Sequence, residues 1–104
     1  MPKIRLTVAY NQPPDSEAFF KHYNEVHAGL ARAIPGLELF EWSTVVATAT
    51  GEPPRYALLA ELTFASMEAF GAGLGSPEGK AAAADVGVFA ANGADMFIGE
   101  LADS

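Results

Sequence analysis

The stretch that decides the fold spans residues 37–64 and reads LELFEWSTVVATATGEPPRYALLAELTF. It predicts two extended segments, residues 37–50 and 55–64, joined by a turn at the Gly51-Glu52-Pro53-Pro54 sequence. Apolar side chains occupy both alternating positions of each segment, a pattern typical of strands that are covered on both faces. We therefore expect two consecutive strands in the middle of the chain, both buried on two sides.

One strand and one helix are predicted before this pair. Residues 3–10 alternate with period two, which indicates a strand. Asp15 is positioned as a helix N-cap, and the helical period continues to Ile34, where Pro35 and Gly36 end the helix. At about 100° per residue, the apolar stripe of this helix covers about 120° of arc. Its members are Phe19, Phe20, Tyr23, Val26, His27, Leu30 and Ile34.

Helical segments and a last strand are predicted after the pair. Ser66 caps a short helix that the glycine-rich residues 71–75 interrupt. Ser76 starts a further helix that reaches about residue 91, and residues 95–101 form a strand. The order β-α-β-β-α-β predicts an α+β, ferredoxin-like fold, with a four-stranded antiparallel sheet and helices on one face. We expect residues 1–104 to form one domain.

Composition excludes several classes of protein. Half of the 104 residues are apolar, 18% are charged and the formal net charge is −7, which argues against a disordered chain. The absence of cysteine excludes disulfide scaffolds, thiolate metal sites and cysteine nucleophiles. The start of the chain lacks a signal-peptide pattern, and no apolar run approaches the roughly 18 residues that span a bilayer. We therefore expect a cytoplasmic protein without a membrane partner.

The charge pattern also argues against nucleic acid as a partner. The six basic residues are scattered along the chain, and the sequence pI is about 4.5. Phosphate binding needs a basic patch that displaces counterions. A charged fraction of 18% is low against a typical value of about 25%. Because two helices cover only one face of four strands, we expect a homodimer in which a second copy packs on the open sheet face.

Four motifs also resemble a known family. They are YNEVHAGL at residues 23–30, IPGL at residues 34–37, LTFASMEAF at residues 62–70 and SPEG at residues 76–79. In this order and spacing they resemble the EthD-like family, which is named for ethyl tert-butyl ether degradation. The resemblance covers nearly the whole chain and implies a dimeric α+β barrel. It also implies kinship with cofactor-independent oxygenases, isomerases and cyclases on the same fold, and with members of no known activity.

His27 is the leading candidate for chemistry. It lies in the apolar stripe, where a neutral imidazole can act as a general acid or base without a cofactor. The alternative is a structural histidine whose ring nitrogens bond a carbonyl or a tyrosine hydroxyl. His22 lies about 140° away around a regular helix, so we expect it at the edge of the stripe or exposed. The two histidines therefore do not predict a metal site.

The other candidate site residues are mostly aromatic. Tyr23, Phe40 and Trp42 are candidates for the walls of a ligand pocket, although core packing is the commoner role of such side chains. Glu61 is the acidic exception in an otherwise apolar strand and is a candidate ligand-binding residue. If it is buried, it needs a partner such as Arg5 or His27, or it stays protonated; the alternative is a residue at the rim of the sheet or the mouth of the barrel. Asp85 is assigned no more than a weak role in the pocket.

Together these features predict a homodimer that binds a small, mostly apolar organic molecule between each sheet and its helices. His27 would perform oxygenase-type or isomerase-type chemistry without a cofactor. One alternative is a non-catalytic accessory or carrier protein in which His27 is structural. Another is an interaction protein whose acidic surface meets a basic partner, and its support is the net charge of −7 alone.

Overall fold

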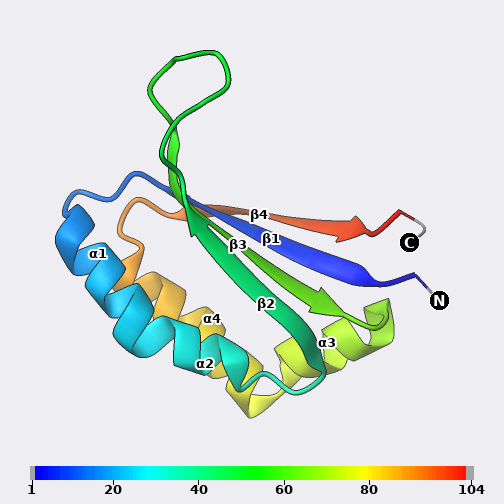
Figure 1. Cartoon of the computed structure of the whole chain (residues 1–104). Coiled ribbons are helices and arrows are strands. Elements are labelled where there is room, and N and C mark those ends of the chain that lie inside the picture. The colour runs from blue at the N-terminus through cyan, green and yellow to red at the C-terminus, as the bar shows by residue number, and fades with distance from the viewer. Residues whose placement is uncertain (1, 103–104) are drawn as a thin grey trace.

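Four strands form one antiparallel sheet in the computed structural model, which describes residues 2–102. The strands are β1 (Ile4–Asn11), β2 (Leu37–Thr44), β3 (Tyr56–Phe64) and β4 (Ala94–Glu100). They lie side by side in the order β2-β3-β1-β4 (Figure 1). The predicted α+β, ferredoxin-like fold is confirmed, and β1 occupies a central position between β3 and β4.

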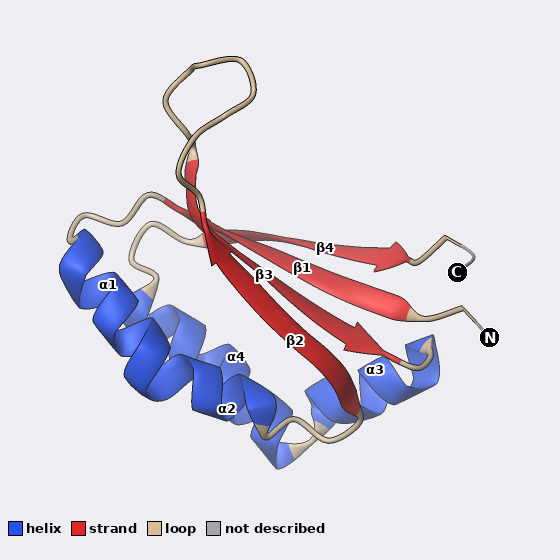
Figure 2. Ribbon diagram, in the orientation of Figure 1, coloured by secondary structure: helices blue, strands red, loops and turns tan. Residues whose placement is uncertain are grey.

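The helices cover one face of this sheet (Figure 2). Ser16–His22 (α1), Tyr23–His27 (the π-helical segment η1) and Ala28–Arg32 (α2) follow one another without a break. Met67–Gly75 (α3) and Pro77–Phe89 (α4) complete the layer. None of the helices within residues 2–102 combines the length and the hydropathy needed to cross a bilayer.

Side-chain caps begin the helices where the sequence predicts them. The carboxylate of Asp15 accepts a hydrogen bond from the amide of Ala18 at 3.1 Å. The Ser66 hydroxyl likewise accepts from an amide of the first turn of α3, and the Ser76 hydroxyl does the same for α4. Each cap satisfies a helical N–H group that has no carbonyl partner inside its own helix.

The glycine-rich segment differs from its prediction. α3 continues through residues 71–75, and the chain breaks its helix at Ser76 instead. The reason is close packing: a Cβ atom on Gly73 would lie 2.5 Å from the Pro35 carbonyl oxygen. A Cβ atom on Gly79 would lie 2.2 Å from the Gly73 carbonyl oxygen. These glycines let α3 approach both α4 and the residues that follow α2, and they do not interrupt the helix.

The expected strand over residues 37–50 is shorter than predicted. β2 ends at Thr44, and residues 45–55 form a loop that projects beyond the end of the sheet (Figure 1). Val46 in this loop is 87% exposed. The apolar residues at positions 45–47 therefore belong to a projecting loop and not to a buried strand.

The two faces of the sheet differ in polarity. On the helix side, Tyr10, Leu58 and Phe64 are almost completely buried. The opposite face carries alternate residues of the same strands, and these are mixed in character: Arg5, Thr7, Ala9, Leu39, Glu41, Ser43, Ala57, Leu59, Glu61, Thr63, Asp95 and Phe97. Apolar residues of β2 and β3 do lie on the open face, as predicted, but charged and hydroxyl side chains are interspersed among them.

Candidate functional site

A π-helical turn brings the two histidines onto the same side of the first helix. The amide of Ala28 donates to the carbonyl of Tyr23, five residues earlier. In such a turn, residues five apart lie closer together around the helix axis than in the regular α-helix that the prediction assumed. His22 lies at the edge of the stripe, as expected, with its side chain 26% exposed, but its ring turns toward the helical layer and bonds Asp85. The same turn leaves Val26, expected in the apolar stripe, 43% exposed.

Asp85 on α4 bonds both histidines. Its Oδ2 lies 2.9 Å from Nδ1 of His27 and 3.0 Å from Nε2 of His22, while its Oδ1 lies 2.9 Å from the same Nε2. Because a carboxylate only accepts, the hydrogen bond places a proton on Nδ1 of His27. Asp85 is 8% exposed and His27 is 5% exposed, so this pairing is shielded from water.

The other ring nitrogen of His27 faces β1. Its Nε2 lies 3.4 Å from the Tyr10 hydroxyl. With the proton on Nδ1, Nε2 carries the free lone pair and accepts from Tyr10. Asp85, His27 and Tyr10 thus form a chain of hydrogen bonds that runs from α4 to the sheet. In this series of hydrogen bonds, Asp85 orients the imidazole of His27 in the way that a buried carboxylate orients a catalytic imidazole.

The two groups that meet on the sheet side of the site, the His27 imidazole and the Tyr10 hydroxyl, are both kept neutral by their surroundings. Burial lowers the pKa of His27 below its ordinary value of 6.5; the Asp85 hydrogen bond and charge oppose this effect, and the His22 charge adds to it. Burial raises the pKa of the Tyr10 hydroxyl well above its usual range, and the Asp85 charge raises it further. A neutral imidazole therefore faces a neutral phenol near pH 7.

A cavity of about 70 Å³ lies between the sheet and the helices beside His27. Aliphatic side chains form most of its wall, and Tyr10, Tyr23 and His27 contribute the groups with ionisable atoms. The side chain of Met96, on the edge strand β4, lines one end and is 52% exposed. The cavity thus approaches solvent at the β4 edge of the sheet.

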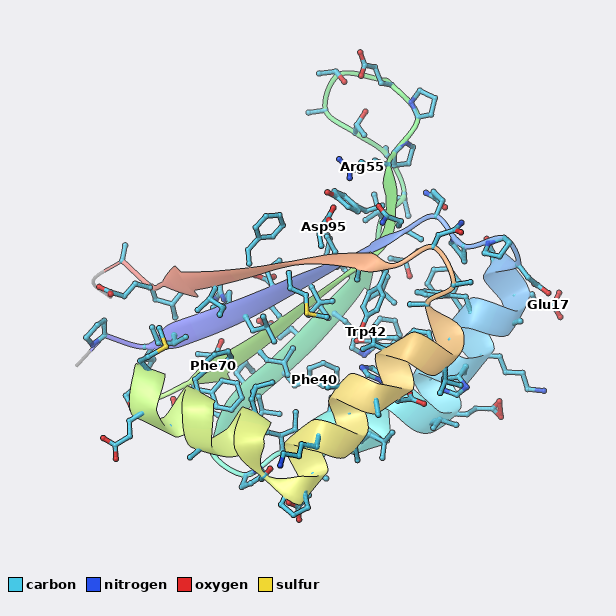
Figure 3. All side chains as sticks on the ribbon, turned by 180° about the vertical axis from the view of Figure 1, so that it is seen from behind. Glu17, Phe40, Trp42, Arg55, Phe70 and Asp95 are labelled. Atoms are coloured by element: carbon cyan, nitrogen blue, oxygen red, sulfur yellow. The ribbon has the colours of Figure 1, made fainter. Side chains whose placement is uncertain are left out.

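Aromatic side chains hold the histidine cluster in place. The Phe89 ring stacks on His22 with centroids 5.0 Å apart and contacts His27 at 4.9 Å. Phe40 and Trp42 extend from β2 into the space between the sheet and the helices (Figure 3). Phe40 lines the cavity, and the Trp42 ring meets Tyr23 edge-on at 4.9 Å. Trp42 therefore supports the wall from behind and is not among the residues that line it.

Glu61 lies on the opposite face of the sheet. It is paired across the strands with Thr7 and Glu41, and its carboxylate lies 3.2 Å from the Arg5 guanidinium. Its side chain is 40% exposed. Of the five predicted site residues, the structure gathers His27, Tyr23 and Phe40 around the cavity, with Trp42 behind them. Glu61 is outside that group, and we do not assign it to the site.

Sequence reasoning missed two members of the cluster, Tyr10 and His22, and gave a third, Asp85, no more than a weak role. Asp85 had one signal, since a carboxylate among the alanines and valines of α4 needs a partner when it is buried. Tyr10 shares the inward face of β1 with Ile4, Leu6 and Val8, so it resembled an ordinary core residue. His22 carried no signal, because residues 22–27 contain nothing that marks a π-helical turn. Within residues 2–102, no three histidine, aspartate or glutamate side chains are arranged as ligands for a metal ion.

A family model described as "EthD domain" matches residues 11–93. The chain belongs to the EthD family. An uncharacterized 11.0 kDa protein from the thcB-thcC intergenic region of Rhodococcus erythropolis is 40% identical over 93 residues, which cover 89% of each chain. The crystal structure of an EthD family protein from Bacillus halodurans has a TM-score of 0.91 and 33% identity, and covers 96% of this chain and 99% of that one.

The fold of this EthD family member also occurs in an enzyme. SnoaB of Streptomyces nogalater, described as a cofactor-independent oxygenase, has a TM-score of 0.72. The comparison covers 100% of this chain and 97% of SnoaB, at 10% identity. At this identity the likeness concerns the fold alone, because one fold hosts many unrelated activities.

Proposed function

We propose that this protein binds a small, mostly apolar organic molecule in the cavity beside His27 and transfers a proton to or from it. The observation that carries the proposal is the 2.9 Å contact between Nδ1 of His27 and Oδ2 of Asp85 at the wall of this cavity. That contact fixes the tautomer and leaves Nε2 as the basic nitrogen, which faces Tyr10, another residue of the cavity wall. The chemistry is of the isomerase or oxygenase type and takes its acid–base group from the protein, without a cofactor.

The size of the cavity limits the ligand. Drug-sized ligands occupy pockets of about 300–1,000 Å³, far above the 70 Å³ found here. A ligand much smaller than a drug-sized molecule, or the reactive end of a longer one, is the appropriate class. A longer molecule would extend past Met96 toward the open edge of the sheet, where β4 is exposed.

We also propose that the protein is a homodimer through its open sheet face. The molecule is flat, with principal extents of 38 × 31 × 17 Å, so this face is one of its two broad sides. Leu39 and Phe97 on this face are 47% and 58% exposed. A second copy would cover these apolar groups.

One observation favours a second candidate function. The Tyr10 hydroxyl already lies within 3.4 Å of Nε2, so the basic nitrogen of His27 has a protein partner. In a carrier or accessory protein this pairing would be permanent and His27 would be structural. In an enzyme, the long contact would be exchanged for one with the ligand.

Hydrogen exchange on a model ketone separates the two candidates. Cyclopentanone is incubated with the protein in D₂O, and deuterium incorporation next to the carbonyl is followed by NMR. The proposed activity predicts exchange faster than with imidazole at the same concentration and pD, and loss of the excess in His27→Gln. Exchange that is no faster than with imidazole, or that is unchanged in His27→Gln, would exclude the acid–base role and leave the carrier.

A further inference from the structure

The hydroxyl of Tyr23 is a buried polar group without a protein partner. Tyr23 has 0% of its surface exposed, and its hydroxyl oxygen has no hydrogen-bond partner among the described residues. Such a group is uncommon in folded proteins, because a buried hydroxyl left unpaired costs about 1–3 kcal/mol. The same side chain lines the cavity beside His27. The hydroxyl is therefore an unpaired donor on a residue that lines the proposed ligand site.

The surroundings keep this hydroxyl protonated. Burial raises the pKa of Tyr23 well above its usual range, the Tyr10 hydroxyl adds to the rise, and the Arg32 charge opposes it. A neutral phenol has one O–H to donate. The ring itself is fixed by edge-on contacts with Tyr10 at 5.7 Å and with Trp42 at 4.9 Å. The hydroxyl oxygen is consequently held in one position before any ligand arrives.

We infer that the ligand carries an acceptor oxygen, of the carbonyl or enolate type, which accepts a hydrogen bond from Tyr23. This inference rests on the proposed function, since it assigns a chemical class to the molecule in the same cavity. The remaining wall is mostly aliphatic, so the rest of the ligand is apolar. A hydrogen bond from the Tyr23 hydroxyl to the carbonyl oxygen of the ligand also polarises that carbonyl and makes the neighbouring C–H bond more acidic. Nε2 of His27 takes the proton, the carbonyl becomes an enolate on Tyr23, and return of the proton to carbon restores the base.

A matched pair of probes tests the acceptor. Cyclopentanone and methylenecyclopentane have nearly the same shape, and the carbonyl oxygen of the first is replaced by a CH₂ group in the second. Binding of each is measured by titration of ¹³C-methyl spectra, in which Leu6, Leu74, Val86 and Met96 report on the cavity wall. The inference predicts that the wild type prefers cyclopentanone by about tenfold, the contribution of one hydrogen bond to a buried donor.

Two variants complete the test. Tyr23→Phe removes the hydroxyl and keeps the ring, so it should abolish the preference and leave the affinity for methylenecyclopentane unchanged. Tyr56→Phe is the control, because the Tyr56 hydroxyl donates to Asp95 at 2.7 Å, away from the residues that line the cavity. Tyr23→Phe should also unfold at a temperature no lower than the wild type, since it removes an unpaired buried group.

The outcomes distinguish the inference from the function on which it rests. Equal binding of the two probes to the wild type, or an undiminished preference for cyclopentanone in Tyr23→Phe, would overturn the inference and leave cavity binding in place. Failure of both probes to shift the cavity methyl groups would overturn the proposed function as well. A fall in the melting temperature of Tyr23→Phe would show that the hydroxyl has a partner within the protein, which also contradicts the inference.

Discussion

Nδ1 of His27 and Oδ2 of Asp85 lie 2.9 Å apart, although 57 residues separate them in the chain and each is more than nine-tenths buried. The contact links the first helical segment to α4 and so belongs to the packing of the helical layer. It also sets the tautomer of the imidazole that faces the cavity. A single hydrogen bond thus serves both stability and the proposed chemistry.

Asp85→Asn tests the structural part of this statement. The amide can accept from one histidine, but its NH₂ group then faces the other ring, where the carboxylate accepted from both. We expect the free energy of unfolding to fall by about 1–3 kcal/mol, the range for hydrogen bonds to a buried charged group. Asp95→Asn is the control, since Asp95 is 39% exposed and lies with Arg55 on the side of the sheet away from the helices (Figure 3). Equal losses in urea unfolding would argue against a special role for Asp85.

The stability should depend on the protonation of His27. Its pKa in the folded protein is lowered from 6.5, mainly by burial, so the unfolded chain binds the proton more readily. The contribution of His27 is therefore complete above about pH 6.5 and is lost as the pH falls from there through the lowered pKa. Urea unfolding of the wild type and His27→Gln across this range isolates the effect. The difference in stability should shrink toward acid, and a difference that grows toward acid would show a raised pKa.

Two glycines of α4 should respond in opposite ways to substitution by alanine. At Gly79 the new Cβ would lie 2.2 Å and 2.6 Å from two backbone carbonyl oxygens of α3, which cannot move independently. We expect Gly79→Ala to lower the free energy of unfolding by about 2–3 kcal/mol. A Cβ atom added at Gly87 would meet nothing within 4 Å. Gly87→Ala should therefore raise the free energy of unfolding by up to about 1 kcal/mol, because alanine favours the helix more than glycine does. Thermal unfolding measures both, and a neutral Gly79→Ala would contradict the close approach of α3 and α4.

If the protein dimerises through its open sheet face, a charged substitution on that face should leave it a monomer. Phe97→Glu places a charge where the second copy would pack, next to Thr7 and close to Glu61. Light scattering at micromolar concentration should give the dimer mass for the wild type and the monomer mass for this variant. Val88→Glu is the control, because Val88 lies on α4 and is 72% exposed away from the sheet. A monomer mass for the wild type would contradict the proposal.

More of the fold than of the candidate site could be predicted from the sequence. Local signals, such as the caps at Asp15, Ser66 and Ser76, act within one helical turn and could be recognised from neighbouring residues. The role of Gly73 depends on contacts with residues outside its own helix, so the glycine-rich residues 71–75 were predicted to interrupt that helix. The family motifs could be recognised because their spacing along the chain is itself a sequence property.

The histidine cluster shows where that reasoning stops. His27 could be predicted because it lies on an apolar stripe, and Tyr23 and Phe40 because they are large and aromatic. The partnership of His22 with Asp85 depends on the π-helical turn, which changes the angle between His22 and His27. A regular period of 3.6 residues cannot represent that change. Likewise, the sequence could not predict that the Tyr23 hydroxyl is unpaired, because this depends on which groups surround it in the folded chain.

The most direct test of the account is the tautomer of His27, read from long-range ¹H–¹⁵N NMR spectra of the ¹⁵N-labelled protein near neutral pH. The two ring nitrogens of a neutral imidazole have distinct ¹⁵N shifts, according to which of them carries the proton. We predict a neutral ring protonated at Nδ1, with Nε2 unprotonated, and loss of this single tautomer in Asp85→Asn. A ring protonated at Nε2, or charged at both nitrogens, would contradict the claim that Asp85 holds a base toward the cavity.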